Sequence, residues 1–269
     1  MTAQAMTVLK ASAAAIDVLR PRQRGVVVLL YHRVGGGAAI QTDLPRPLFQ
    51  RQMDDLAAGT NVVGLDTALD AISQLPPAGH DPVVISFDDG TADFVDVALP
   101  LLKERRLPTT LYIATDFIER SVSFPHGGRP LSWAALRDVV ATGLVTIGSH
   151  THTHAPFDRV APAGAAQELD RSIGLIQDRL DMTPRHFAYP KALRAPGAVE
   201  SEVRSRFRSA ALAGTRPNLY GATNPHRLAR SPVQVADGLR WFRRKAAGGM
   251  AFEDAVRRAT WRVRYAGRV

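Results

Sequence analysis

Short apolar runs alternate with segments of helical periodicity along most of the chain. Residues 26–32 read Val-Val-Val-Leu-Leu-Tyr-His, and several later runs are apolar almost throughout. Strands without a polar face are typical of parallel sheets covered by helices, so the pattern predicts an α/β barrel or an open doubly wound sheet. The predicted strands are 26–32, 61–65, 83–87, 109–114, 144–148, 186–189, 209–213 and 227–233. The predicted helices are 47–58, 66–75, 94–106, 133–142, 163–180, 198–206 and 236–265, the last broken at Gly248-Gly249.

No linker interrupts this alternation, which favours a single α/β domain. We divide the chain into an N-terminal helical extension (1–24), the α/β domain (25–235) and a basic C-terminal helical segment packed on it (236–269). A length of 269 residues with 45% hydrophobic content is ordinary for a globular domain of this kind.

The chain contains no cysteine, which excludes disulfides, thiolate metal sites and cysteine nucleophiles. Any metal must therefore be held by His, Asp, Glu or water. Lys10 and Asp17 interrupt the alanine-rich first twenty residues, so no signal-peptide core is evident, and no run is long enough to span a membrane. We expect a protein of the cytoplasm or of the inner membrane face, with export by another route left open.

The net charge is +9, with many arginines between residues 227 and 268. A basic segment can bind an anionic polymer or a membrane surface, but it can equally form solvated helix faces. We favour solvated faces and expect no nucleic-acid partner, because no nucleic-acid motif accompanies the charge. Peripheral membrane contact through the basic or N-terminal segments stays an alternative.

Polar side chains capable of chemistry follow several of the predicted strands directly. His32 ends the first run, Asp88 and Asp89 follow the third, and a Ser-His-Thr-His-Thr-His stretch begins at Ser149. Tyr189 closes a later strand. Because the carboxyl ends of parallel strands meet at one rim, these residues are expected to lie together.

The histidine stretch has a spacing that depends on the backbone conformation. On an extended strand the side chains of His150 and His154 would be roughly 13 Å apart, too far to share an ion. On a coiled turn they would be neighbours at about 6 Å. Metal binding therefore requires the chain to coil after Gly148, which turns His152 away from the site. A polar loop without metal is the alternative.

Two adjacent aspartates at the end of an apolar strand leave negative charge that a metal ion would compensate. One aspartate can then bind the ion while its neighbour takes a proton from the attacking water. Two histidines and one carboxylate leave positions open, as a catalytic site requires. A solvated turn capped by Asp88 or Asp89 is the structural alternative.

With these residues assembled, the chain resembles the polysaccharide deacetylase family, also called the NodB-homology or carbohydrate esterase 4 family. The matching segments span roughly residues 26–233 in the family's order: Leu29-Leu30-Tyr31-His32-Arg33-Val34, Ser86-Phe87-Asp88-Asp89-Gly90, Gly148 to His154 and Phe187-Ala188-Tyr189-Pro190. The resemblance implies a single domain with a distorted (β/α)7 barrel.

The resemblance also implies a site and a reaction. Asp89, His150 and His154 would bind a divalent metal, zinc first, with nickel, cobalt or manganese as alternatives. Asp88 would be the general base in removing an N-acetyl group from an amino sugar in a polysaccharide, glycolipid or glycoside. A backbone N–H after Pro190 would help to hold the oxyanion.

Two family features are missing. Many members carry an arginine in the third motif that orients the catalytic aspartate, where this chain has Ala188, and Arg185 is offset from that position. Many also carry a late histidine as general acid, and none occurs after His226. Both gaps resemble the subgroup with an early Tyr-His segment, in which that histidine is the acid, which implies the role for His32. A structural hydrogen bond is the alternative for His32.

Tyr189, Pro190, Lys191 and Trp133 are the candidates for substrate contact, although a surface lysine and a packed tryptophan are common. A carbohydrate-binding relative with little catalysis, and a barrel hydrolase of a non-sugar amide, remain competing hypotheses for the whole protein.

Overall fold

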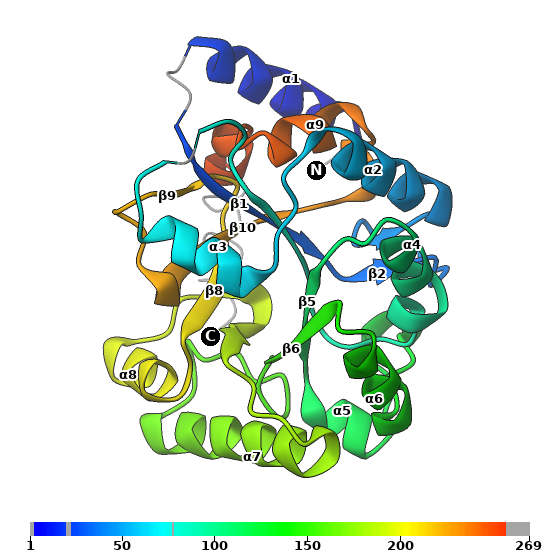
Figure 1. Cartoon of the computed structure of the whole chain (residues 1–269), viewed down its shortest axis with the longest axis vertical. Coiled ribbons are helices and arrows are strands. Elements are labelled where there is room, and N and C mark those ends of the chain that lie inside the picture. Colours follow the sequence, from blue (N-terminus) through cyan, green and yellow to red (C-terminus); the bar gives the residue numbers. More distant parts are fainter. Residues whose placement is uncertain (1–2, 20–22, 77, 257–269) are drawn as a thin grey trace.

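A closed parallel barrel organises the protein (Figure 1). The computed structural model describes residues 3–19, 23–76 and 78–256. Within them seven parallel strands pair in the order β1-β4-β5-β6-β7-β8-β10, and β10 closes back onto β1. The barrel strands are β1 (Gly25–Tyr31), β4 (Val83–Phe87), β5 (Thr109–Ile113), β6 (Val145–Ser149), β7 (His186–Ala188), β8 (Ser209–Ala213) and β10 (Leu228–Pro232). Of the two folds that the sequence pattern predicts, the structure therefore has the closed barrel and not the open doubly wound sheet.

Helices surround the barrel, with α7 along the lower edge of Figure 1 and α1 at the top. Their bounds are α1 (Ala3–Leu19), α2 (Arg46–Gly59), α3 (Leu65–Ile72), α4 (Leu99–Glu104), α5 (Thr115–Glu119), α6 (Trp133–Ala141), α7 (Pro162–Leu180), α8 (Gly197–Arg206) and α9 (Arg240–Ala246). Among the described residues, no helix combines the length and the apolar character needed to cross a bilayer.

Both faces of the barrel strands are buried, as their apolar runs predict. All seven residues of β1 are buried, and its alternate residues pack in two different clusters. Val26 and Val28 point inward, where they meet inward residues of the other strands and the apolar face of α3. Val27 and Leu29 pack outward. The helix α3 therefore covers the end of the barrel where the strands begin, and the opposite rim is left for the strand ends.

Several predicted elements differ in the structure. Residues 61–65 form only a single bridge, Val62 to Val83, instead of a strand. The helix predicted at 94–106 begins as a π-helical turn (Phe94–Ala98) because Pro100 has no N–H for the regular hydrogen bond. The short strands β2 (Arg33–Val34), β3 (Asp43–Leu44) and the antiparallel β9 (Asn218–Leu219), and helix α5, were not predicted.

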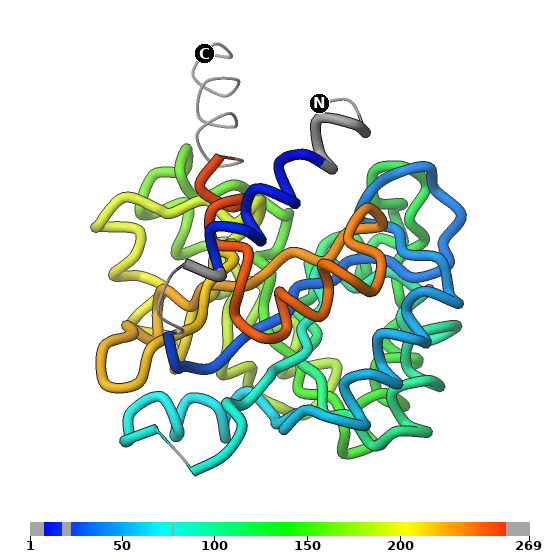
Figure 2. The backbone as a smooth tube through the Cα atoms, turned by 90° about the horizontal axis from the view of Figure 1, so that it is seen from above, coloured from blue at the N-terminus to red at the C-terminus, as the bar shows by residue number. Residues whose placement is uncertain are grey.

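The C-terminal helix predicted at 236–265, broken at Gly248-Gly249, is confirmed in part: residues 240–246 and 251–256 are helical on either side of that break, but the first residues of the prediction are not part of the α-helix. A 3-10 turn (Val235–Asp237) ends at Gly238, where φ is +52°, and α9 ends before Gly248, where φ is +82°. These left-handed positions stop a right-handed helix. Helical residues follow at 251–256, and the rest of the prediction lies outside the described residues. Seen from above, α1 lies beside α9 and the residues that follow it up to 256 (Figure 2).

Candidate metal centre

The loops after β4 and β6 take unusual backbone conformations at the residues predicted to bind metal. Asp89 has φ +75° and is followed by Gly90 at +92°, while Thr151 and His154 have φ +68° and +61°. Positive φ is uncommon for residues other than glycine and concentrates at functional sites. The chain does coil after Gly148, as metal binding by His150 and His154 requires.

This backbone brings one aspartate and two histidines together. One ligand atom from each of Asp89, His150 and His154 lies within 4.8 Å of the others. Nε2 of His154 is 3.4 Å, and Nε2 of His150 3.6 Å, from Oδ1 of Asp89. Two atoms that are each about 2.1 Å from a tetrahedral zinc ion are about 3.4 Å apart, so the donor set and its spacing fit a zinc-sized ion.

Both histidines are held in a form that can donate an electron pair. Nδ1 of His150 lies 2.8 Å from the backbone oxygen of Ala188, so Nδ1 carries the proton and Nε2 is left for the metal. Burial, together with the neighbouring His150, lowers the pKa of His154 to about 4. The ring of His154 is therefore neutral near pH 7.

His152 faces away from this group, as predicted. Its Nδ1 lies 3.0 Å from Oγ1 of Thr115 and its Nε2 3.6 Å from Asp116. The carboxylate of Glu168 on α7 accepts hydrogen bonds from the backbone N–H groups of His152 and Thr153. The middle histidine and Glu168 thus fix the loop that carries the outer two.

Asp88, the second carboxylate, is paired with an arginine that the sequence analysis did not single out. Arg230 on β10 donates to both oxygens of Asp88, at 2.5 and 2.8 Å. Asp88 is 4% exposed and Arg230 is fully buried. Burial alone would raise the pKa of Asp88, but the charge and hydrogen bonds of Arg230 outweigh it and bring the pKa to about 2. Asp88 is therefore ionised near pH 7, and Arg230 fixes the orientation of its two oxygens.

Arg230 lies inside the barrel, below the rim. It is two residues after the inward-facing Leu228, and its guanidinium lies 5.2 Å from the ring centre of Tyr112. Tyr112 fits because Gly148 faces it: a Cβ at Gly148 would come within 2.5 Å of the ring. Arg185 is instead largely exposed and pairs with Asp66. The signal for Arg230 in the sequence was a charged residue at an inward position of a barrel strand.

His32 follows β1 at the same rim. The backbone N–H of Asp88 donates at 3.1 Å to the carbonyl of Tyr31, the residue before His32, so the chain segments that carry His32 and Asp88 are adjacent. In the described part of the chain, Nδ1 of His32 is buried without a hydrogen-bond partner. The structural hydrogen bond that is the alternative role for His32 is therefore not formed at Nδ1.

The four predicted substrate-contact residues differ in environment. Tyr189 is 2% exposed and packs edge-on against Phe187. Pro190 is buried, and Lys191, with φ +54°, is exposed. Trp133 is half-buried at the start of α6, capped by Ser132 as predicted, and its indole N–H donates to Glu119 at 2.7 Å. Lys191 is thus the one of the four whose side chain is freely accessible.

Comparison with known proteins places these motifs in a family context. A family model described as polysaccharide deacetylase matches residues 76–208, which include Asp88, Asp89 and the histidine loop. His32 and Arg230 lie outside the matched region. The protein named "Putative polysaccharide deacetylase YxkH" from Bacillus subtilis (strain 168) is 24% identical over 164 residues, which cover 61% of this chain and 55% of that protein.

Solved structures share the fold over most of the chain. IcaB from Ammonifex degensii superposes with a TM-score of 0.73 at 24% identity, covering 84% of this chain and 98% of IcaB. The deacetylase PplD of Streptococcus pyogenes, solved in complex with acetate, has a TM-score of 0.68 at 17% identity, covering 81% of this chain and 97% of PplD. At these identities the likeness concerns the barrel fold.

Proposed function

Because this chain belongs to the polysaccharide deacetylase family, we propose that it is a metal-dependent hydrolase that removes an N-acetyl group from an amino sugar. The observation that carries the proposal is the convergence of Asp89, His150 and His154 beside a separate, ionised Asp88. Three ligands and an adjacent carboxylate are the parts that hydrolysis of an amide by activated water needs.

The residues divide the chemistry between them. A bound divalent metal would polarise the acetyl carbonyl and make the attacking water more acidic. Asp88 would accept the proton of that water, and Arg230 holds its two oxygens in one orientation. Arg230 also limits the basicity of Asp88, so the water must be acidified for the transfer to proceed. This explains why the base lies directly beside the metal ligands.

The departing amine of the sugar needs a proton as the C–N bond breaks. We assign this role to His32, because it follows Tyr31, whose carbonyl accepts from the backbone N–H of Asp88, and because its Nδ1 has no partner among the described residues. An imidazole with an unengaged nitrogen can donate a proton without first losing a hydrogen bond. The products are then acetate and a free amino sugar. PplD, which shares the fold, was solved with acetate bound.

Substrate contacts are assigned to the loop after β7 and to the start of α6. Lys191 is exposed next to the buried Pro190, and Trp133 presents part of its ring. Tyr189 shapes the loop from beneath, through its packing on Phe187. A backbone N–H after Pro190 would help to hold the oxyanion.

The test measures metal content and acetate release on the same preparations. Purified protein is stripped with a chelator, reloaded with zinc, nickel, cobalt or manganese, and incubated with N-acetylglucosamine and its oligomers. We expect acetate release only after reloading. Asp88→Asn should keep the metal and lose acetate release, whereas His150→Ala should lose both. His80→Ala is the control, because this exposed histidine lies outside both loops of the site, and it should retain both.

Two results would contradict the proposal. Sugar binding without acetate release by the reloaded protein would indicate a binding protein. Release of acetate by the stripped protein at an undiminished rate would remove the metal from the reaction.

A further inference from the structure

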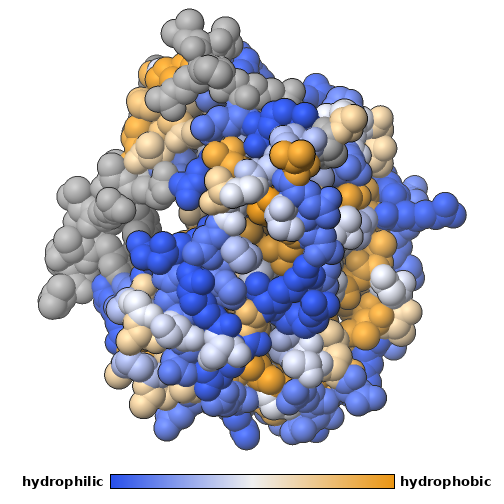
Figure 3. Space-filling view, turned by 60° about the vertical axis from the view of Figure 1, so that its left-hand side comes forward, coloured by the Kyte–Doolittle hydropathy of each residue, from blue (hydrophilic) through white to orange (hydrophobic). Residues whose placement is uncertain are grey.

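Helix α1 contacts the rest of the domain through its charged side chains. Its sequence contains two charged residues, Lys10 and Asp17. Lys10 is 1% exposed, and Asp17 accepts a hydrogen bond from the backbone N–H of Met250. Val8 of the same helix is 62% exposed, and apolar residues gather at this end of the molecule in Figure 3. A surface helix ordinarily turns its charges to water and its apolar side to the core. The position of α1 is therefore set by its charges as well as by its apolar packing.

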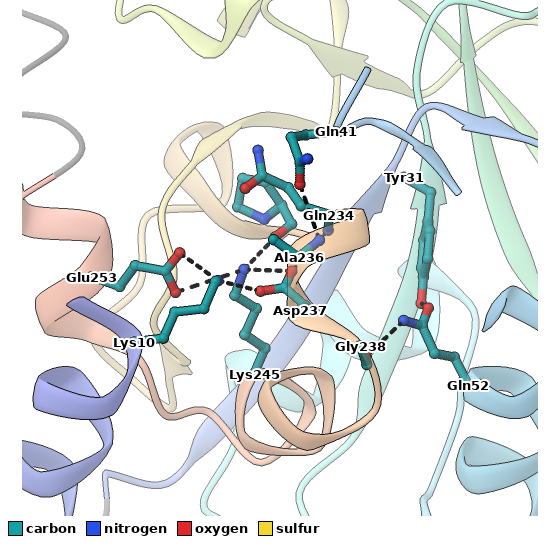
Figure 4. Close-up of polar contacts among 11 residues, drawn as sticks. Lys10, Tyr31, Gln41, Gln52, Gln234, Ala236, Asp237, Gly238, Lys245 and Glu253 are labelled. Atoms are coloured by element: carbon teal, nitrogen blue, oxygen red, sulfur yellow. Dashed lines mark hydrogen bonds and ion pairs between the residues drawn. The ribbon is translucent and has the colours of Figure 1, made fainter. Parts of the chain in front are cut away.

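Lys10 belongs to a buried network of four charges (Figure 4). It donates to Asp237 at 2.5 Å and to Glu253 at 2.8 Å, and Lys245 of α9 donates to Asp237 at 2.8 Å. All four side chains are at most 1% exposed, and two positive charges face two negative ones. Replacing such a network by apolar side chains of similar size is often neutral or stabilising, so stability does not explain it. The network does fix positions, because each buried charge must meet its partners.

Asp237 fixes the turn that follows β10. Its Oδ2 accepts a hydrogen bond at 2.7 Å from the backbone N–H of Gln234, at the start of the 3-10 turn. Lys245, its second cation, also donates to the backbone oxygen of Pro232 at 2.8 Å. Pro232 is the last residue of β10 and lies two positions after Arg230. The network is therefore joined by hydrogen bonds to the end of the strand that carries the arginine partner of the proposed base.

The same turn also holds the end of β1. The hydroxyl of Tyr31 donates to Gln52 at 3.0 Å, and Gln52 donates to the backbone oxygen of Gly238 at 3.2 Å (Figure 4). Gly238 ends the 3-10 turn. Tyr31 is the last residue of β1 and precedes His32, and its backbone oxygen accepts from the N–H of Asp88. The ends of two neighbouring barrel strands, one leading to His32 and one carrying the arginine, are thus held by one turn.

From these contacts we propose that Lys10 is a positioning residue for the reaction at the metal centre. Through Asp237 it fixes the turn after β10, and that turn holds the strand ends that place Arg230 and His32. A misplacement of about 1 Å caused far from the reacting atoms can cost about a hundredfold in rate. Helix α1 then belongs to the catalytic unit, although it precedes the barrel in sequence. This inference rests on the proposed function.

Steady-state kinetics of the zinc-loaded full chain test the inference. Lys10→Met should lower kcat for acetate release about tenfold or more, because the strand ends lose their alignment. KM and bound zinc should not change, because the metal ligands lie on other loops. The urea midpoint should also fall, since Asp237 and Glu253 are left to share one buried cation, Lys245. An unchanged kcat would overturn the inference.

A double variant separates positioning from stability. Lys10→Met with Glu253→Gln removes one charge of each sign and leaves the pair of Lys245 and Asp237. The urea midpoint should recover, because no buried charge lacks a partner in this network. The kcat should stay low, because Asp237 still lacks its contact with α1. Recovery of kcat together with the midpoint would overturn the inference, since Lys10 would then serve stability alone.

The matched control is Asp17→Ala, which removes a hydrogen bond between the same helix and Met250 without touching Asp237. It should lower the urea midpoint and leave kcat unchanged. A loss of kcat as large as that of Lys10→Met would overturn the inference, because any loosening of α1 would then have the same effect.

Amide hydrogen exchange gives a readout that does not require turnover. The N–H groups of Val233 and Asp88 donate to the backbone oxygens of Leu30 and Tyr31, at 2.9 and 3.1 Å. Both should exchange about tenfold faster or more in the double variant, while the N–H of Thr109 at the start of β5 keeps its rate. Unchanged exchange at Val233 and Asp88 would overturn the inference. If the unchanged zinc-loaded chain releases no acetate, the proposed function fails, and exchange still decides whether Lys10 positions the strand ends.

Discussion

Replacing Arg230 by Met tests whether the buried arginine keeps Asp88 ionised. Met fills much of the same space and leaves the Asp88 carboxylate, 4% exposed, without its cation. Removing one partner of a buried ion pair typically costs about 3–5 kcal/mol. Protonation of Asp88 can relieve that cost at 1.36 kcal/mol per pKa unit, which is a rise of about 2–4 units. The pKa of Asp88, now about 2, should then reach roughly 4–6.

The rise in the pKa of Asp88 should be visible in two measurements, the free energy of unfolding and the pH profile of acetate release. With its pKa below the unfolded value, Asp88 stabilises the unchanged protein above about pH 4, and this stabilisation is lost only as the pH falls toward 2. In Arg230→Met the free energy of unfolding should be lower by about 3 kcal/mol at pH 7, and part of the loss should be recovered at pH 5. The acid limb of the acetate-release profile should move upward in pH by about 2 units or more.

The assay pairs urea unfolding with acetate release across the pH range. A double variant, Arg230→Met with Asp88→Asn, removes both charges and should recover much of the stability without any activity. The reasoning is refuted if Arg230→Met unfolds within about 0.5 kcal/mol of the unchanged protein and keeps its acid limb in place. It is also refuted if the double variant is as unstable as the single one.

Three further predictions concern other residues of the barrel. His32→Gln should lower kcat/KM for acetate release about a hundredfold or more with unchanged metal content, and an unaltered rate would exclude it as the acid. Gly148→Ala should lower the free energy of unfolding by about 1–3 kcal/mol, because its Cβ would meet the ring of Tyr112. Gly174→Ala in α7, where space is open, is the control and should be neutral or stabilising. Burial lowers the pKa of His186 to about 4, so the folded state should lose up to about 3 kcal/mol as the pH falls from 6.5 to 4, and His186→Gln should flatten that part of the urea-unfolding profile.

Barrel strands such as β1 and β4 could be predicted because both of their faces are buried, which leaves a nearly continuous apolar run. The strand predicted at 209–213 coincides with β8, and that at 83–87 with β4. The two-residue strands β2, β3 and β9 could not be found this way, since so short a segment shows no periodicity. The last helix was predicted to begin too early because the positive φ at Gly238 depends on contacts made by the fold, whereas its break could be predicted from the Gly248-Gly249 pair.

In the metal centre too, contacts between residues close in sequence could be predicted, and contacts between distant residues could not. His150 and His154 are close in sequence, and the geometry of one loop decides whether they can share an ion. The pair of Asp88 and Arg230 joins residues 142 positions apart, and it forms only because β10 closes the barrel onto β1. The spacing of residues along the sequence does not indicate that β10 pairs with β1. An arginine at an inward position of an apolar strand was the only local sign of it.

The role of the metal is tested most directly by titrating zinc into chelator-stripped protein while following acetate release from N-acetylglucosamine oligomers. The ligand set of Asp89, His150 and His154 predicts that activity rises with added zinc and saturates at a single bound ion per chain, and that His150→Ala shows neither tight binding nor activity. Activity that is already complete in the stripped protein, or that rises equally in His150→Ala, would contradict the account.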